Sequence, residues 1–211
     1  MTEWVALLRG VNVGGVTIRS EELASAVRSA GLDDVRTVLA SGNVLFTTPD
    51  APGTSAAPDV PGEPDAAGGA DRDAASGLRA RLEAALSDRF AYEARVFVAP
   101  RSRVVATIDA YPFEELTDRQ AYVVVTDDAD VLEDLLAAMA EAVRADRTAT
   151  SFEPGTPALD DVDRVARGDG VAYWSCPKGA STTTPVAKVL TRARFRTATT
   201  TRNLATLRKL V

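Results

Sequence analysis

The sequence predicts an α+β protein made of two units, each with the element order β-α-β-β-α-β. Short apolar segments compatible with strands alternate with segments in which apolar residues recur every three or four positions, as in helices. Each half also contains two strand segments joined by a short glycine-containing turn, Ser41–Asn43 in the first half and Gly168–Gly170 in the second. Such turns are typical of hairpins.

The first half contains all six elements of this order. They are expected as a strand at 3–9, a helix at 21–30, strands at 35–40 and 44–47, a helix at 78–90 and a strand at 94–99. Ser20 opens the first helix, acidic residues follow in its first turn, and Gly31 ends it. In the second helix the spacing of Leu78, Leu82 and Leu86 produces one apolar face.

The second half repeats the order less clearly. A helix at 101–110 is expected to connect the halves, followed by a strand at 121–126, a helix at 131–143, strands at 162–167 and 171–176, and helices at 185–190 and 203–210. We therefore predict two ferredoxin-like subdomains with antiparallel sheets, at residues 1–100 and 101–211. The duplication is inferred from the pattern of elements, because no sequence repeat links the halves.

An insertion interrupts the first half. Residues 49–77 consist almost wholly of Pro, Gly, Ala, Asp, Ser and Thr, and Val60 is their only large aliphatic residue. Such a segment buries too little apolar surface to offset the entropy lost on ordering. We predict a disordered insertion.

Composition excludes several classes of chemistry. The chain has 211 residues, no histidine and one cysteine, Cys176. The usual general base, the commonest metal ligand, disulfides and four-cysteine zinc sites are missing, and we predict no cofactor and no metal site. The first residues lead into a strand rather than a signal peptide, and no apolar run approaches about 18 residues, so we expect a cytoplasmic protein without a membrane partner.

Charge is distributed unevenly along the chain. The net charge is −6, yet residues 171–211 carry eight Lys and Arg and no acid, which leaves −14 on the remaining residues. One interpretation is that this basic segment docks on the acidic body of the same protein. The other is that it binds an anionic partner such as nucleic acid.

Two polar loops are expected to meet at one edge of the first sheet. In this topology the first strand lies antiparallel to the third, so the end of one meets the start of the other. The residues of these loops are Arg9, Gly10, Asn12, Gly14, Gly15, Ser41, Gly42 and Asn43. Their guanidinium, amide and backbone donors predict a binding site for a carboxylate or phosphate. The structural alternative is that the glycines and Asn43 only permit tight turns.

A second candidate cluster lies near the C-terminus, at Thr201, Arg202 and Asn203. We expect Thr201 to cap the last helix and Arg202 to lie in its first turn. A cation there opposes the helix dipole, which suggests a role in ligand binding. Cys176 is expected to be a buried strand residue, because without histidine only a cation such as Lys178 is available to activate its thiol.

Three motifs together carry a resemblance to a known family. They are Leu7–Gly15 (LLRGVNVGG), Ser41–Phe46 (SGNVLF) and Thr201–Leu207 (TRNLATL). With them the chain is similar to a bacterial family catalogued as domain of unknown function 1697. The resemblance implies two ferredoxin-like subdomains and no established activity, substrate or cofactor. The chain departs from the family pattern at Val16–Ile18, where members often carry lysine, and at Leu204, where an aromatic residue is usual.

Three functions are compatible with these residues. The first is binding of a small or extended anionic ligand at the edge that carries Arg9 and Asn43. The second is a transferase or hydrolase at the same edge that works without histidine, although the sequence offers it no convincing nucleophile or base. The third is nucleic-acid binding through the basic segment. Against this third function, Phe46 is the only aromatic residue of the third strand, so the stacking pattern of RNA-binding sheets is missing. The oligomeric state is not predicted.

Overall fold

The structure, a computed structural model, describes residues 1–11, 17–39, 42–49, 66–150 and 163–211. The chain divides into two compact units. The first comprises Met1–Val105 with Lys209–Val211, and the second comprises Ala106–Arg208. The predicted division lies near residue 100 with the whole C-terminus in the second half, whereas the last three residues group with the first unit.

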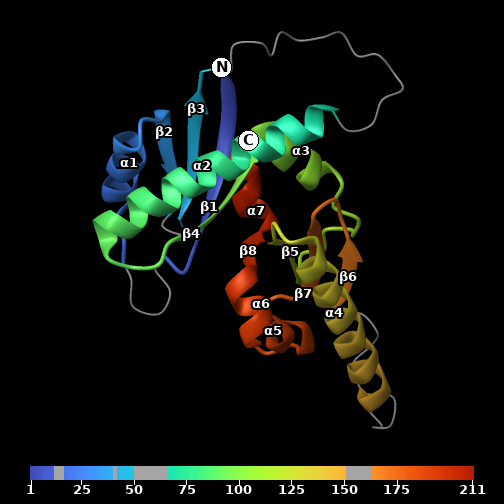
Figure 1. Ribbon diagram of the computed structural model, residues 1–211. Coiled ribbons are helices and arrows are strands. Elements are labelled where there is room, and N and C mark those ends of the chain that lie inside the picture. The colour runs from blue at the N-terminus through green and yellow to red at the C-terminus, as the bar shows by residue number, and fades with distance from the viewer. Residues whose placement is uncertain (12–16, 40–41, 50–65, 151–162) are drawn as a thin grey trace. The chain divides into compact units, whose positions relative to one another are not determined.

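In the first unit, four strands form one antiparallel sheet with the order β2-β3-β1-β4 (Figure 1). Its elements are β1 (Thr2–Arg9), α1 (Ser20–Ser29), β2 (Asp33–Val38), β3 (Asn43–Thr48), α2 (Ala66–Phe90) and β4 (Arg95–Pro100). The next helix, α3 (Arg101–Asp109), begins in the first unit and ends in the second. The first strand therefore has an antiparallel neighbour on each side.

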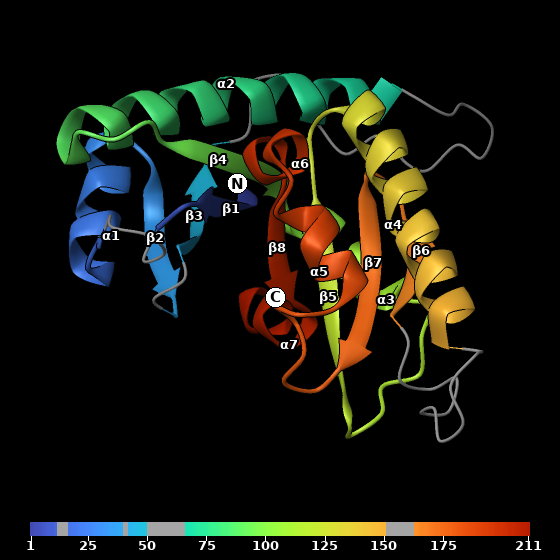
Figure 2. The same cartoon turned by 90° about the horizontal axis from the view of Figure 1, so that it is seen from below.

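The second unit repeats this architecture with a sheet of order β6-β7-β5-β8 (Figure 2). Its elements are β5 (Arg119–Val125), α4 (Ala129–Thr150), β6 (Arg164–Arg167), β7 (Val171–Pro177), α5 (Pro185–Leu190), α6 (Ala193–Ala198), β8 (Thr200–Asn203), α7 (Leu204–Leu207) and a 3-10 turn (Arg208–Leu210). Both sheets place their strands in the order second, third, first, fourth. The predicted α+β class with two similar subdomains is confirmed.

Both helices of the first unit cover the same face of its sheet. Trp4, Ala6 and Leu8 alternate along β1 onto this face, where all three are buried. The helices contribute apolar residues spaced by three and four positions. These are Leu23, Ala24, Ala26 and Val27 on α1 and Leu82 and Leu86 on α2. Each fully buried large aliphatic side chain contributes about 1.5–3 kcal/mol of transfer free energy.

The prediction of a disordered insertion at 49–77 is wrong in its second part. Residues 66–77 form the first half of α2, whereas residues 50–65 lie outside the described residues. Five alanines, the best helix formers, outweigh three glycines in this stretch. The packed half of α2 also supplies a nucleus from which the helix extends, and Ala75 already lies against the core.

The C-terminal segment also differs from the prediction. Thr200–Asn203 form β8, which pairs with β5, and Thr201 is not a helix cap. The cap of α7 is Asn203, whose Oδ1 accepts a hydrogen bond from the N–H of Ala205 at 2.9 Å. β-branched threonines favour an extended backbone, and pairing with β5 supplies the fourth strand that the sequence pattern missed.

A buried carboxylate joins α5 to the sheet of the second unit. Asp163 is 1% exposed. Its Oδ1 accepts a hydrogen bond from Trp174 Nε1 and its Oδ2 accepts one from the backbone N–H of Val186, both at 2.9 Å. Thr184 caps the same helix by accepting from the N–H of Ala187 at 3.2 Å. Asp163 therefore satisfies a helix-terminal donor and an indole donor that would otherwise be buried without partners.

Asp163→Ala is expected to lower the free energy of unfolding by about 2–4 kcal/mol, because it leaves both donors buried and unsatisfied. Urea unfolding followed by tryptophan fluorescence measures the change. The control is Asp118→Ala, which removes an exposed carboxylate of the same unit and should cost less than about 0.5 kcal/mol. Equal stability of the two variants would contradict the role assigned to Asp163.

Candidate functional site

Three strands of the first sheet bring polar residues to one end. Arg9 is the last residue of β1, Asn43 is the first of β3, and Arg95 is the first of β4. Across the strands, Leu7 lies opposite Asn43 and Arg9 lies opposite Arg95. The predicted meeting of the end of the first strand with the start of the third is confirmed. Arg95 joins them because β4 also runs antiparallel to β1.

Arg9 and Arg95 form a cross-strand pair of like charge. Residues directly opposite each other point to the same face of a sheet, with Cβ atoms about 4.5–5.5 Å apart, and like charges at such positions are destabilising. Glu93 offsets part of this repulsion, since its Oε1 accepts from Arg95 Nη2 at 2.5 Å. The side chains of Glu93 and Arg95 are both mostly exposed, so their ion pair contributes little to the stability of the protein. Two neighbouring guanidinium groups suit an anion that carries more than one charge.

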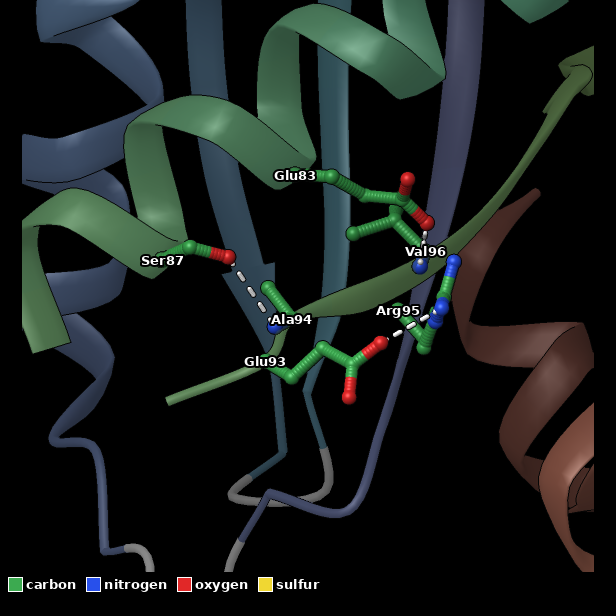
Figure 3. A network of polar contacts seen from close by, with 6 residues as sticks. All are labelled: Glu83, Ser87, Glu93, Ala94, Arg95 and Val96. Carbon is green, nitrogen blue, oxygen red and sulfur yellow. Dashed lines mark hydrogen bonds and ion pairs between the residues drawn. The ribbon is translucent and has the colours of Figure 1, made fainter. Parts of the chain in front are cut away.

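Helix α2 fixes the part of β4 that carries Arg95 (Figure 3). Glu83 Oε1 accepts a hydrogen bond from the N–H of Val96 at 3.0 Å, and Ser87 Oγ accepts one from the N–H of Ala94 at 3.1 Å. β4 is an edge strand, and these two donors face the helix instead of another strand. Both hydrogen bonds form because the acceptors and the donors are similarly spaced. Glu83 and Ser87 are four helical residues apart, a rise of about 6 Å, and Ala94 and Val96 are two strand residues apart, about 6.7 Å. Both neighbours of Arg95 are thereby held.

Gly42 and Asn43 have structural roles in the turn between β2 and β3. Gly42 has a φ of 69°, and its carbonyl accepts a hydrogen bond from the N–H of Leu8 at 2.7 Å. A Cβ on Gly42 would lie 2.9 Å from the Cβ of Leu8, so glycine permits this close approach. Asn43 is fully buried, and its Nδ2 donates to the carbonyl of Val38 at 2.9 Å. These contacts support the structural interpretation of the turn.

The structure describes only part of the predicted site. Asn12, Gly14, Gly15 and Ser41 lie outside the described residues. Gly10 has a φ of 74°, which glycine adopts without strain. Arg95 was not among the predicted site residues, although the topology contained part of the signal. In this topology the fourth strand lies beside the first and antiparallel to it, so the start of β4 lies near the end of β1, and the register then sets Arg95 opposite Arg9.

In the second unit the predicted cluster of Thr201, Arg202 and Asn203 lies on β8. Arg202 is 9% exposed, and its Nη1 donates to Thr200 Oγ1 at 2.7 Å and to the carbonyl of Thr201 at 3.0 Å. Burial lowers the pKa of its guanidinium to about 10, because desolvation penalises the charged form. Holding a charge at this position therefore costs stability.

A second buried arginine lies on β5. Arg119 donates from Nε to Ser175 Oγ and from Nη2 to the carbonyl of Ser175, both at 3.0 Å. Burial raises the pKa of Tyr111, an effect that its hydrogen bond with Ser175 opposes. The Tyr111 ring also packs edge-on against Tyr173, with centroids 5.6 Å apart. The Ser175 hydroxyl is thus held between a cation and a phenol that stays protonated at neutral pH, and neither activates it as a nucleophile.

Cys176 is buried on β7, as predicted. Burial raises the pKa of its thiol to about 11, and the charge of Asp163 adds to this rise while that of Arg119 opposes it. A protonated thiol without solvent access is not a nucleophile.

Two cations of the basic segment pair with acids of the second unit. Arg194 forms an ion pair with Asp134, and Arg208 forms one with Glu115. The hydrogen bond from Arg208 lowers the pKa of the Glu115 carboxyl. All four side chains are substantially exposed, so each pair contributes little to stability. For these two cations the contacts agree with docking on the protein's own acidic surface.

Among the described residues, no three acidic or cysteine side chains gather as the ligands of a metal ion. Of the helices described, none combines the length and the apolar character needed to cross a bilayer.

A family comparison matches residues 1–60 and 69–152 to a family described as Protein of unknown function (DUF1697). The chain belongs to this family. The resemblance seen in the sequence is thereby confirmed at the level of the family. The matched residues of this DUF1697 protein include β1, β3 and β4, and they end before β8.

Known structures show the fold of the DUF1697 protein and nothing of its activity. A conserved bacterial protein from Streptococcus pneumoniae is similar over 100% of this chain and 96% of its own, with a TM-score of 0.63 and 21% identity. An unknown protein from Galdieria sulphuraria, 12% identical over 96% of each chain, has a TM-score of 0.22 and carries no argument. No curated protein matches the chain.

In this DUF1697 protein, Arg202→Met is expected to raise the free energy of unfolding at pH 7 by about 1–3 kcal/mol, because it removes a desolvated charge and keeps much of the side-chain volume. The folded-state pKa of Arg202 is lowered to about 10, so above that pH the unfolded state binds more protons than the folded state and wild-type stability rises. The advantage of the variant should therefore shrink above pH 10. Urea unfolding of both proteins at pH 7 and above pH 10 measures this change. A less stable variant at pH 7 would show that the hydrogen bonds of Arg202 outweigh its desolvation.

The thiol of Cys176 is expected to resist an aromatic disulfide reagent at pH 8 in the native protein. With a pKa of about 11, roughly one thiol in a thousand is ionised, and burial blocks access to it. In concentrated urea one thiol per chain should react within minutes. Equally fast reaction of the native and unfolded protein would contradict the burial of this residue.

Proposed function

We propose that this protein binds a small ligand through a phosphate group at the end of β1. The cross-strand pair of Arg9 and Arg95 is the observation that supports it. Each guanidinium presents a planar fork of donors, and two forks on one sheet face can surround a phosphate from two sides. A single carboxylate is satisfied by one fork, so a pair favours the doubly charged group.

The contacts around this pair hold the backbone that carries it. Hydrogen bonds from Ala94 and Val96 to α2 hold the start of β4. On the other side of β1, the hydrogen bond between Leu8 and Gly42 holds the turn. A backbone that is already fixed adds no ordering cost of its own when the side chains bind. Within the proposal, Arg9 and Arg95 contact the anion, and Gly42 and Asn43 position the loop beside them.

An enzyme at the same end requires a nucleophile or a base in addition to the anion contacts. The described polar side chains there are those of Arg9, Asn43, Glu93 and Arg95. The two arginines and the asparagine exchange no proton near neutral pH, and the Glu93 carboxylate is engaged in its ion pair with Arg95. We therefore favour binding over chemistry. Nucleic-acid binding is less favoured, because the one aromatic residue of β3, Phe46, is buried and offers bases no stacking surface.

The test is calorimetric titration with inorganic phosphate and methyl phosphate at low ionic strength. Arg9→Ala and Arg95→Ala should each weaken binding at least about tenfold, the usual loss for a hydrogen bond to a charged group. Raising the salt concentration should weaken binding by the wild type as well.

Arg72→Ala is the matched control, because Arg72 is an exposed arginine of the first unit that lies on α2. It should bind phosphate as the wild type does. Wild-type affinity in both Arg9→Ala and Arg95→Ala would place the phosphate elsewhere and overturn the proposal.

A further inference from the structure

Leu39 has two unusual properties at the same end of the first sheet. It follows the last residue of β2, and its side chain is 48% exposed. Its φ is 57°, in the left-handed region. Among the residues that the structure describes, the other non-glycine residues with positive φ are Asp34 and Ala91, so Leu39 is the one with a large apolar side chain.

Neither property favours stability. A side chain in the left-handed region has a steric cost that glycine avoids and that asparagine or aspartate reduces. A half-exposed leucine also leaves apolar surface in water. Asp34 differs, because its residue type tolerates this conformation and its Oδ2 accepts a hydrogen bond from Thr47 Oγ1 at 3.0 Å. Strained residues that persist cluster at ligand-binding sites, which points to a functional reason for Leu39.

A buried hydrogen bond determines where Leu39 lies. Asn43 Nδ2 donates to the carbonyl of Val38, the residue before Leu39. Val38 and Asn43 also lie opposite each other across β2 and β3. The backbone leading into Leu39 is therefore anchored to β3, the strand next to β1.

The strand order sets the distance from Leu39 to the arginine pair. β2 is separated from β1 by two strand spacings and from β4 by three. At about 4.8 Å per spacing, the end of β2 lies about 10–14 Å from Arg9 and Arg95 along this end of the sheet. That span is longer than a phosphate group and fits an extended chain attached to one.

We infer that the ligand is an amphipathic phosphate, whose anion binds Arg9 and Arg95 and whose apolar chain lies against Leu39. The inference rests on the proposed phosphate site and adds the chemical class of the rest of the ligand. The apolar chain covers the exposed part of Leu39, which gives a left-handed leucine at this position a function that glycine or asparagine could not supply.

The test is calorimetric titration with alkyl phosphates from methyl to octyl, each below the concentration at which it forms micelles. Short members should bind wild-type protein with similar affinity. Once the chain is long enough to reach Leu39, each added methylene should tighten binding by about two- to fourfold, the factor expected for burial of one methylene.

Leu39→Asn removes the apolar contact and suits a left-handed backbone, so this variant should fold at least as stably as the wild type. It should bind methyl phosphate with wild-type affinity and lose the dependence on chain length. Val105→Thr is the matched control, because Val105 is an exposed aliphatic residue of the first unit on α3. This control should keep the wild-type dependence on chain length.

The outcomes separate the inference from the proposal beneath it. If octyl and methyl phosphate bind with equal affinity, and both lose affinity in Arg9→Ala, the inference is overturned and the phosphate site stands. Persistence of the chain-length dependence in Leu39→Asn overturns the inference as well. If neither inorganic phosphate nor any alkyl phosphate binds, the proposed function fails, and the inference fails with it.

Discussion

The pairing of β1 with an antiparallel strand on each side is the constraint on which the candidate site depends. Because β3 and β4 both run opposite to β1, the end of β1 meets the start of both neighbours, with Leu7 opposite Asn43 and Arg9 opposite Arg95. This places Arg9 between Asn43 and Arg95 although the three lie far apart in sequence. The pairing also sets two arginines opposite each other, and Glu93 offsets part of their repulsion through its ion pair with Arg95.

The second unit shows how the same topology handles buried charge. Asp163 is fully enclosed and is compensated by an indole donor and a helix-terminal N–H. Arg202 is enclosed on the fourth strand, and its lowered pKa shows that its surroundings disfavour the charged form. One buried charge thus stabilises the packing of a helix on the sheet, whereas the other carries a desolvation cost that its hydrogen bonds to Thr200 and Thr201 oppose.

Most of the secondary structure was predictable because it follows local rules. The spacing of Leu82 and Leu86 indicates a helix, and the turn at Gly42 indicates a hairpin. Two errors have the same physical origin. The first half of α2 and the strand Thr200–Asn203 are weak local signals that neighbouring structure completes. A nucleated helix extends through an alanine-rich stretch, and a short strand forms where a sheet offers it a partner.

In the first unit the sequence by itself predicted the strand order, and with it the meeting of the end of β1 with the Gly42–Asn43 turn, because its element order β-α-β-β-α-β is typical of a ferredoxin-like unit, which has one strand order. Only the tertiary structure decided how the donors are used. The amide of Asn43 is directed to the carbonyl of Val38, and Arg95 lies opposite Arg9. Both facts depend on the register between strands distant in sequence, and a local pattern carries no information on register or on which partner a buried donor will find.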